Sequence, residues 1–156
     1  MAKALVNKIL LFSSVDGPGN RTAIFFQGCN FNCLYCHNPE TINRCTGCGL
    51  CLDACPAGAL SSRNGTIEWD SASCIGCDAC LEACPGKSSP KAVSMTVNDV
   101  MKTVEKVKPF ISGITVSGGE CTIQKEFLAE LFEAVHKLGL TAYVDTNGYI
   151  DFSKEP

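Results

Sequence analysis

Two copies of a single cysteine pattern dominate this chain of 156 residues, which holds 12 cysteines in all. Each copy reads C-x2-C-x2-C-x3-C-P, and the surrounding text repeats with it, CTGCGLCLDACP against CIGCDACLEACP. The segment is therefore an internal duplication. So many regularly spaced cysteines indicate cross-linking by disulfides or binding of metal. The eight residues of the two runs are Cys45, Cys48, Cys51 and Cys55, then Cys74, Cys77, Cys80 and Cys84.

This spacing is typical of bacterial ferredoxins that hold a pair of [4Fe-4S] clusters, in which the fourth cysteine of each run ligates the other run's cluster. Three thiolates on a short loop wrap one face of a cube, and the fourth must come from elsewhere. Applied here, the rule predicts one cluster on Cys45, Cys48, Cys51 and Cys84, and another on Cys74, Cys77, Cys80 and Cys55.

Structural zinc sites and a disulfide knot are the alternatives to clusters. Zinc sites usually use two separated C-x2-C pairs, and this run of four does not have that form. The longest apolar runs, such as residues 9–12, are too short for a membrane span or a signal peptide. We therefore expect that the protein is not associated with a membrane and that it resides in the reducing cytoplasm. Thiols stay reduced there and bind metal.

Composition narrows the classes of partner. Hydrophobic residues make up 46% and charged residues 19% of the chain, which is typical of a folded domain. The formal charge of −3 provides no basic face, so we expect no nucleic-acid partner.

Cys29, Cys33 and Cys36 follow a different rule, C-x3-C-x2-C, with no fourth cysteine in the run. Three thiolates hold three irons of a cube and leave the fourth iron open, and an open position separates a reactive metal site from a closed one. The alternative is that Cys121, the one cysteine left over, closes this cluster. Otherwise Cys121 is a small buried hydrophobic residue.

The C-x3-C-x2-C spacing, with Tyr35 before its last cysteine, resembles the cluster loop of the radical S-adenosylmethionine (SAM) superfamily. Two flanking motifs, Asp16-Gly17-Pro18-Gly19 and Cys36-His37-Asn38-Pro39, are similar to those of the activating enzymes of glycyl radical enzymes, the pyruvate formate-lyase activating type. A ferredoxin-like insert directly after the cluster loop occurs in one large branch of that family.

The resemblance implies a reaction. SAM would chelate the open iron of the first cluster, and one electron would cleave it to methionine and a 5′-deoxyadenosyl radical. That radical would take a Cα hydrogen from a glycine of a partner, a glycyl radical enzyme. The cofactors would be SAM and three [4Fe-4S] clusters. The two ferredoxin-like clusters would relay electrons from a donor such as flavodoxin or ferredoxin.

The resemblance also implies site residues. The Gly118-Gly119-Glu120 loop matches a GGE motif that contacts the SAM amino group: glycines let the backbone approach, and a carboxylate suits an ammonium. Asp145 begins Asp-Thr-Asn-Gly, a family stretch near the SAM carboxylate or else an ordinary turn. Tyr35 and His37 would lie near the cofactor, His37 through its backbone. Asp16 would line the approach of the partner's glycine loop or form a plain tight turn.

The fold predicted is α/β with a parallel sheet. Strands are expected at residues 22–27, 66–69, 111–116 and 141–145. Helices are expected from a capping box at Thr96 to Pro109, and from Phe127 to Gly139. Residues 1–44 and 93–156 would form a partial (β/α) barrel and residues 45–92 the ferredoxin-like insert.

The resembled family uses six barrel units, but only about three barrel strands are visible. We therefore expect the N-terminal part of a longer protein, truncated within the barrel and poorly active alone. Two rival functions remain. One is a ferredoxin-type electron carrier without SAM chemistry, which leaves the three-cysteine loop unexplained. The other is a radical SAM enzyme that acts on a small molecule or RNA. The DGPG and CHNP motifs argue against this alternative.

Overall fold

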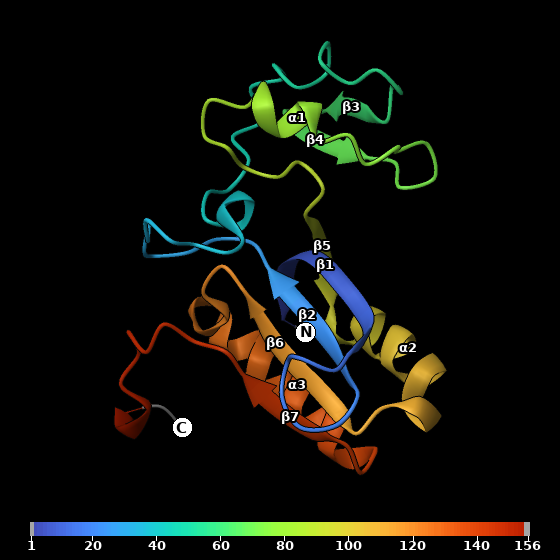
Figure 1. Ribbon diagram of the computed structural model, residues 1–156, viewed down its shortest axis with the longest axis vertical. Coiled ribbons are helices and arrows are strands. Elements are labelled where there is room, and N and C mark those ends of the chain that lie inside the picture. Colours follow the sequence, from blue (N-terminus) through green and yellow to red (C-terminus); the bar gives the residue numbers. More distant parts are fainter. Residues whose placement is uncertain (1, 155–156) are drawn as a thin grey trace.

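The computed structural model describes residues 2–154 as a sheet with two helices on one face, and a small cysteine-rich unit beyond one end of the sheet (Figure 1). The five-stranded sheet has the order β5-β1-β2-β6-β7, and β3 and β4 form a separate hairpin. The strands are β1 Lys3–Ser13, β2 Arg21–Phe26, β3 Leu60–Arg63, β4 Thr66–Trp69, β5 Val93–Thr96, β6 Gly113–Gly118 and β7 Thr141–Val144. The α-helices are α1 Ala79–Glu82, α2 Val97–Val107 and α3 Lys125–Lys137, and the 3-10 helices are η1 Pro39–Thr41, η2 Lys108–Phe110, η3 Cys121–Gln124 and η4 Phe152–Lys154.

The main core lies between the sheet and helices α2 and α3. Alternate residues of the central strands face the helices, because successive side chains of a strand point to opposite faces. Ile24, Phe26, Ile114 and Val116 are fully buried there. Phe26 packs edge-to-face on Phe127 of α3, with ring centroids 5.8 Å apart.

Both predicted helices are confirmed. The Thr96 side chain accepts a hydrogen bond from the Asp99 backbone, and the Asp99 side chain accepts one from the Thr96 backbone, which is the capping box expected. Helix α2 ends at Val107, and Pro109 lies in the short 3-10 helix η2 that follows. Helix α3 stops at Lys137, and Gly139 follows with φ +75°, the left-handed region that favours glycine.

The expectation of a parallel sheet is only partly right. Strands β2, β6 and β7 are parallel, as predicted, but β1 pairs antiparallel with β2 and with β5, so the sheet is mixed. Neither β1 nor β5 was predicted. Strand β5 has four residues at a sheet edge and no alternation of buried and exposed side chains, so its sequence carries no strand signal.

The cysteine-rich unit leaves the sheet after β2 and rejoins it at β5 (Figure 1). Its hairpin joins β3 to the predicted strand β4 through Asn64-Gly65, and both residues have positive φ, as a tight hairpin turn requires. A small core of Cys51, Ile67 and Cys80 holds the unit together.

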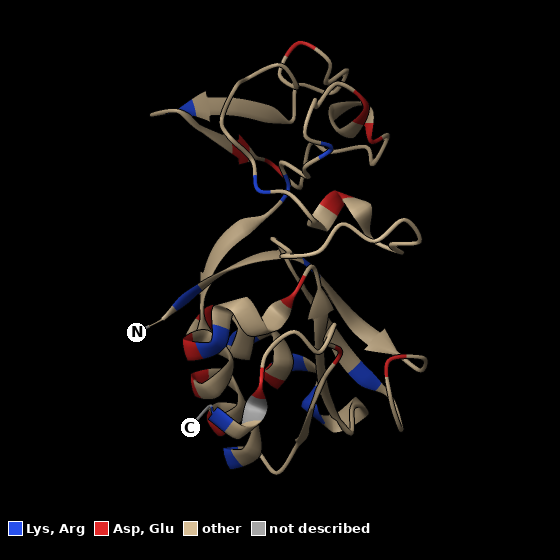
Figure 2. Cartoon of the chain, turned by 90° about the vertical axis from the view of Figure 1, so that its left-hand side faces the viewer, with Lys and Arg blue, Asp and Glu red and all other residues tan. Residues whose placement is uncertain are grey.

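Acidic and basic residues are interspersed along the chain, and both signs occur on helices α2 and α3 (Figure 2). Within residues 2–154, no helix has the length and apolar content needed to cross a bilayer.

Arg21 fastens the three parallel strands together at their amino ends. Its side chain points away from the helices and is 1% exposed. The guanidinium donates hydrogen bonds to the Ile114 carbonyl at 2.6 Å, the Thr115 hydroxyl at 2.8 Å and the Thr141 hydroxyl at 3.0 Å. It also donates to the Pro18 carbonyl at 3.2 Å, which ties down the DGPG loop.

We expect Arg21→Leu to lower the free energy of unfolding by about 3 kcal/mol, because it leaves several buried acceptors without a donor. Urea unfolding of the anaerobically purified chain measures this. Arg63→Leu is the matched control: Arg63 is exposed and lies 3.6 Å from Glu68, so its loss should cost less than about 0.5 kcal/mol. Equal effects of the two substitutions would contradict a structural role for Arg21.

Candidate active site

Three loops meet where β2, β6 and β7 end. The three-cysteine loop follows β2, the Gly-Gly-Glu loop follows β6, and Asp145 follows β7. Because the three strands are parallel neighbours, these loops share the carboxyl edge of the sheet, where α/β folds carry their chemistry. The Gly119 amide donates to the Phe26 carbonyl at 2.9 Å, and the Asp145 amide donates to the Val116 carbonyl at 2.9 Å. The structure thus brings together residues predicted separately from the sequence.

The three-cysteine loop is tied at both of its ends. The Gly28 amide donates to the Thr41 carbonyl at 2.7 Å, and the Cys29 amide donates to the Ile42 carbonyl at 2.9 Å. Gln27, which is 1% exposed, donates its side-chain amide to the Glu40 carbonyl at 2.8 Å. The loop therefore closes on itself, and its cysteines lie between two fixed ends. Sequence reasoning missed Gln27, since a glutamine at a strand end gives no signal.

Gly118 and Gly119 lie against the base of this loop. A Cβ added to Gly118, whose φ is +110°, would lie 2.3 Å from the Phe26 amide nitrogen. One added to Gly119 would lie 2.2 Å from the Gly28 carbonyl oxygen. Backbone packing alone therefore requires both glycines. Their contact with SAM stays a prediction.

Glu120 is 1% exposed, and four donors surround its carboxylate. Oε1 accepts from the Thr122 amide at 3.0 Å, the Thr122 hydroxyl at 2.6 Å and the Thr146 hydroxyl at 2.9 Å. Oε2 accepts from the Asn147 amide at 2.7 Å. Burial by itself raises the pKa of Glu120, but these hydrogen bonds, that of the Thr122 hydroxyl first, outweigh it and hold the pKa below its usual value.

Asn147 connects the loop after β7 to the three-cysteine loop. Its side-chain amide donates to Asn30 Oδ1 at 2.9 Å and lies 3.9 Å from Cys29 Sγ. Sequence reasoning chose Asp145 from this stretch and missed Asn147. The Asn-Gly pair at residues 147–148 was a turn signal only, and the partner lies 117 positions away in the chain.

The carboxyl groups of Asp16 and Asp145 lie close enough for their charges to interact. Burial, and then the negative charge of Asp16, raise the pKa of the Asp145 carboxyl, which a hydrogen bond with Ser117 partly offsets. Asp16 is held in place because the Thr115 hydroxyl donates to its carbonyl and the Ser13 hydroxyl to its carboxylate. The DGPG loop precedes β2 and so begins at the amino ends of the parallel strands, opposite to the three-cysteine loop, but its Asp16 reaches Thr115 partway along β6.

Two predicted cofactor residues stand apart from this group. Tyr35 is 90% exposed, and His37 is also exposed. The aromatic contact that the structure does make here is between Phe31 and Tyr149, whose ring centroids lie 5.9 Å apart. The roles of Tyr35 and His37 stay predictions.

Cys121 is fully buried beneath the loops, as the prediction of a small buried residue required. Its thiol donates to the Asp145 carbonyl at 3.4 Å. Burial, with the nearby Glu120 charge, raises the pKa of Cys121 to about 12. A thiol so reluctant to ionise is a poor metal ligand, because the thiolate is the binding form.

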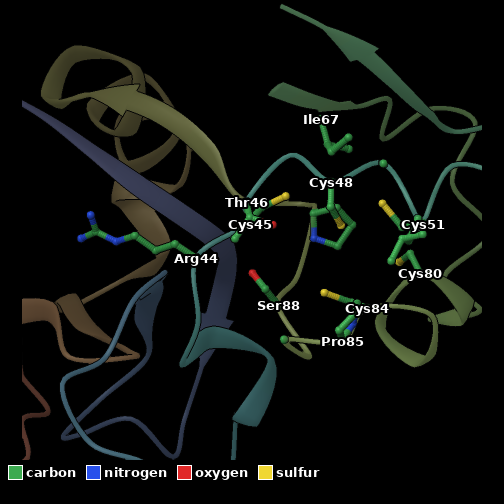
Figure 3. A pocket seen from close by; sticks show the side chains of 14 residues that line it. Arg44, Cys45, Thr46, Cys48, Cys51, Ile67, Cys80, Cys84, Pro85 and Ser88 are labelled. Carbon is green, nitrogen blue, oxygen red and sulfur yellow. The ribbon is translucent and has the colours of Figure 1, made fainter. Parts of the chain in front are cut away.

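The first predicted set of cluster ligands lines one cavity of about 260 Å³ in the cysteine-rich unit. Figure 3 shows Cys45, Cys48, Cys51 and Cys84 around the same space, whereas the Arg44 side chain extends away from it. Cys84 comes from the second run, as the exchange of fourth ligands between the runs predicts. Four thiols around such a space have the donor chemistry for a [4Fe-4S] cluster.

The second predicted set, Cys55, Cys74, Cys77 and Cys80, lines a neighbouring cavity of about 20 Å³. Cys80 borders both cavities. The donor set again suits a cluster, but the space is narrow, so the thiols must move outward to admit one.

All twelve cysteines carry free thiols. Within residues 2–154, no three Cys, His, Asp or Glu side chains converge on a point that could hold a single metal ion. A zinc ion needs its sulfur ligands about 2.3 Å from one point, whereas a cube takes ligands at its corners. The assignment of clusters to these two sites stays a prediction.

Comparison with known proteins identifies the family. The sequence profile of the radical SAM superfamily matches residues 23–155. The chain belongs to the radical SAM superfamily. The cysteine-rich unit lies inside this radical SAM match, between the loop after β2 and strand β5.

Two curated relatives of this radical SAM chain are activating enzymes. The chain is 36% identical over 165 residues to the choline trimethylamine-lyase activating enzyme of Oleidesulfovibrio alaskensis, covering 94% of the chain and 53% of that protein. It is 38% identical over 159 residues to the indoleacetate decarboxylase activating enzyme of Tractidigestivibacter scatoligenes, covering 86% and 50%. The chain thus spans about half the length of the curated relatives it matches. The crystal structure of QueE from Escherichia coli has a similar fold, with a TM-score of 0.58 at 16% identity over 94% of this chain and 53% of that one.

We expect Glu120→Gln to lower the free energy of unfolding at pH 7 by about 2–4 kcal/mol. The glutamine side chain has no charge, and its NH2 group would point toward N–H and O–H groups that now donate hydrogen bonds to the Glu120 carboxylate. Urea unfolding measures the change. Glu133→Gln is the control: Glu133 is an exposed residue of α3, and its loss should cost less than about 0.5 kcal/mol. A Glu120→Gln protein as stable as this control would show that the carboxylate does not hold the loops.

We expect Cys121→Ala to keep the full complement of about twelve irons per chain, and Cys33→Ala to lose about four of them. The reason is that Cys121 is sealed and protonated, whereas Cys33 is a predicted ligand. Iron analysis after anaerobic reconstitution measures both. Loss of a cluster from Cys121→Ala would restore the alternative in which Cys121 closes the first cluster.

Proposed function

We propose that this chain is the cluster-bearing part of an activating enzyme for a glycyl radical enzyme. The observation that carries the proposal is the loop of three cysteines at the carboxyl edge of the sheet, whose one candidate for a fourth thiol ligand, Cys121, is buried with its pKa raised. The activating enzymes among its relatives support the same function. We assign Cys29, Cys33 and Cys36 to a [4Fe-4S] cluster with one open iron.

When bound there, the reduced cluster supplies the electron that cleaves SAM into methionine and a 5′-deoxyadenosyl radical, which abstracts hydrogen from a glycine. The protein's part is to orient the cofactor and keep water out. The Gly-Gly backbone brings the end of β6 against the cluster loop, and Glu120 fixes the loop carrying Thr146 and Asn147 beside it. In this proposal the SAM amino group lies at Glu120 and its carboxylate near Asp145.

Asp16 belongs to the DGPG loop and lies close enough to Asp145 for their charges to interact, so it is proposed to meet the substrate. Its loop is fixed by hydrogen bonds to Arg21 and Thr115. A loop that is held in position by the strands beneath it can present a constant surface to an incoming glycine. Tyr35 and His37, which are exposed beside the cluster cysteines, belong to the cofactor's surroundings in this proposal.

The cysteine-rich unit is proposed to be a ferredoxin-like insert, residues 45–92, with two [4Fe-4S] clusters that relay electrons from a donor such as flavodoxin or ferredoxin. The two cavities support this assignment, since each is lined by three cysteines of one run and the fourth of the other. A strong reductant is needed to cleave a sulfonium, and iron–sulfur clusters reach potentials as low as about −700 mV.

We expect SAM to change the electron paramagnetic resonance spectrum of the reduced chain, because the cofactor would occupy the open iron of the first cluster. The spectrum is recorded anaerobically with and without SAM. Cys33→Ala is the control: it lacks the first cluster, and its remaining signals should not respond. A parent spectrum that SAM leaves unchanged would support the rival function, an electron carrier.

The same preparation addresses the second rival, a radical SAM enzyme for a small molecule. A glycyl radical enzyme added with SAM should acquire a radical signal that disappears when its radical-bearing glycine is replaced by alanine. A SAM response without that signal in any tested partner would favour a small-molecule substrate.

A further inference from the structure

Trp69 has a buried polar atom that the fold leaves without a partner. It is the sole tryptophan of the chain and the last residue of β4. Its indole Nε1–H is buried and has no hydrogen-bond acceptor within residues 2–154. Leaving a buried N–H without an acceptor is costly, so the position indicates an acceptor that the protein alone does not supply.

The indole forms part of the wall of the second cysteine cavity, together with Cys55, Cys74, Cys77 and Cys80. Cys74, a predicted ligand of the second cluster, lies five residues after Trp69 in the chain and lines the same cavity. Sulfur is the only acceptor that this cavity would gain on binding a cluster.

No tryptophan lines the first cavity. In the internal duplication, the position that corresponds to Trp69 is Glu40, 29 residues earlier, and Glu40 is not among the residues that line the first cavity. Lys91 also borders the second cavity, but its ammonium lies 2.6 Å from an Asp78 oxygen, which offsets its charge. Within residues 2–154, a buried side-chain donor without a partner lines the second cavity, and none lines the first.

We propose that Trp69 donates a hydrogen bond to a sulfur of the cluster held by Cys55, Cys74, Cys77 and Cys80, and raises its reduction potential above that of its twin. This rests on the two-cluster assignment made above. Reduction adds negative charge to the cluster, so a hydrogen bond to its sulfur stabilises the reduced form more than the oxidised form. Trp69 is thus a positioning and tuning residue of the second site.

Selective isotope labelling tests the contact in the unaltered chain. Because Trp69 is the sole tryptophan, ¹⁵N-indole tryptophan labels one nitrogen beside the clusters. Pulsed electron paramagnetic resonance of the reduced protein should then detect a ¹⁵N hyperfine coupling to one cluster. If no coupling appears in protein that holds about twelve irons, the proposal is wrong.

A variant tests the effect on the potential. Trp69→Phe keeps the ring and removes the N–H, and should lower the equilibrium constant for reduction of one cluster about tenfold, a fall of about 59 mV for one electron. Ile67→Val is the control, since Ile67 lies on the same strand, lines the first cavity and donates no hydrogen bond. Equal potentials in the parent chain and in Trp69→Phe would overturn the proposal. If Trp69→Phe assembles no second cluster, the isotope measurement on the unaltered chain decides whether the hydrogen bond exists.

Iron analysis separates this inference from the function on which it rests. A parent chain with only about four irons would lack the ferredoxin-like clusters, and the role of Trp69 would fall with them. The response of the first cluster to SAM would still stand in that case. With about twelve irons and no SAM response, the tuning by Trp69 could still be measured while the proposed enzyme would be lost.

Discussion

The buried carboxylate of Glu120 is the interaction on which the arrangement of the candidate site depends. A charge removed from water is costly unless it is fully hydrogen-bonded, and here the donors come from both the loop after β6 and the loop after β7. The Glu120 amide also donates to the Gly28 carbonyl at 2.8 Å, at the base of the cluster loop. One residue therefore holds three loops that are far apart in sequence. Neither the loop after β6 nor the loop after β7 can shift alone without leaving the buried charge short of a donor.

The hydrogen bonds around Glu120 limit how the Gly-Gly-Glu motif can contact a ligand. Oε1 already accepts three hydrogen bonds, and Oε2 accepts one. A carboxylate oxygen offers about two lone-pair sites, so Oε2 alone has a site left for an ammonium. The main contribution of Glu120 in this state is to organise the loop of Thr146 and Asn147, and any direct contact with the cofactor amino group must be made through Oε2.

The features that the sequence predicted well are local ones. The capping box of Thr96 and Asp99 and the end of α3 before Gly139 follow from residue types along short stretches of chain. Strands β1 and β5 could not be predicted in the same way, because their pairing joins residues about 90 positions apart. Gln27 and Asn147 act through hydrogen bonds with partners that are distant in the sequence, and Trp69 is notable because its indole N–H has no partner in the described part of the chain. The type of a single residue reveals neither property.

The cysteine-rich unit is attached so that its position relative to the first cluster loop is fixed. The Ser89 amide donates to the Glu40 carbonyl at 3.0 Å, and the Ser88 hydroxyl donates to the Asn43 carbonyl at 2.8 Å. Both serines are buried, and the side-chain amide of Gln27 reaches the same carbonyl groups from the end of β2. The segment that returns to β5 is thus bound to the segment that leaves the cluster loop. The proposed electron relay depends on the distance between the first cluster loop and this unit, and hydrogen bonds at the junction hold that distance.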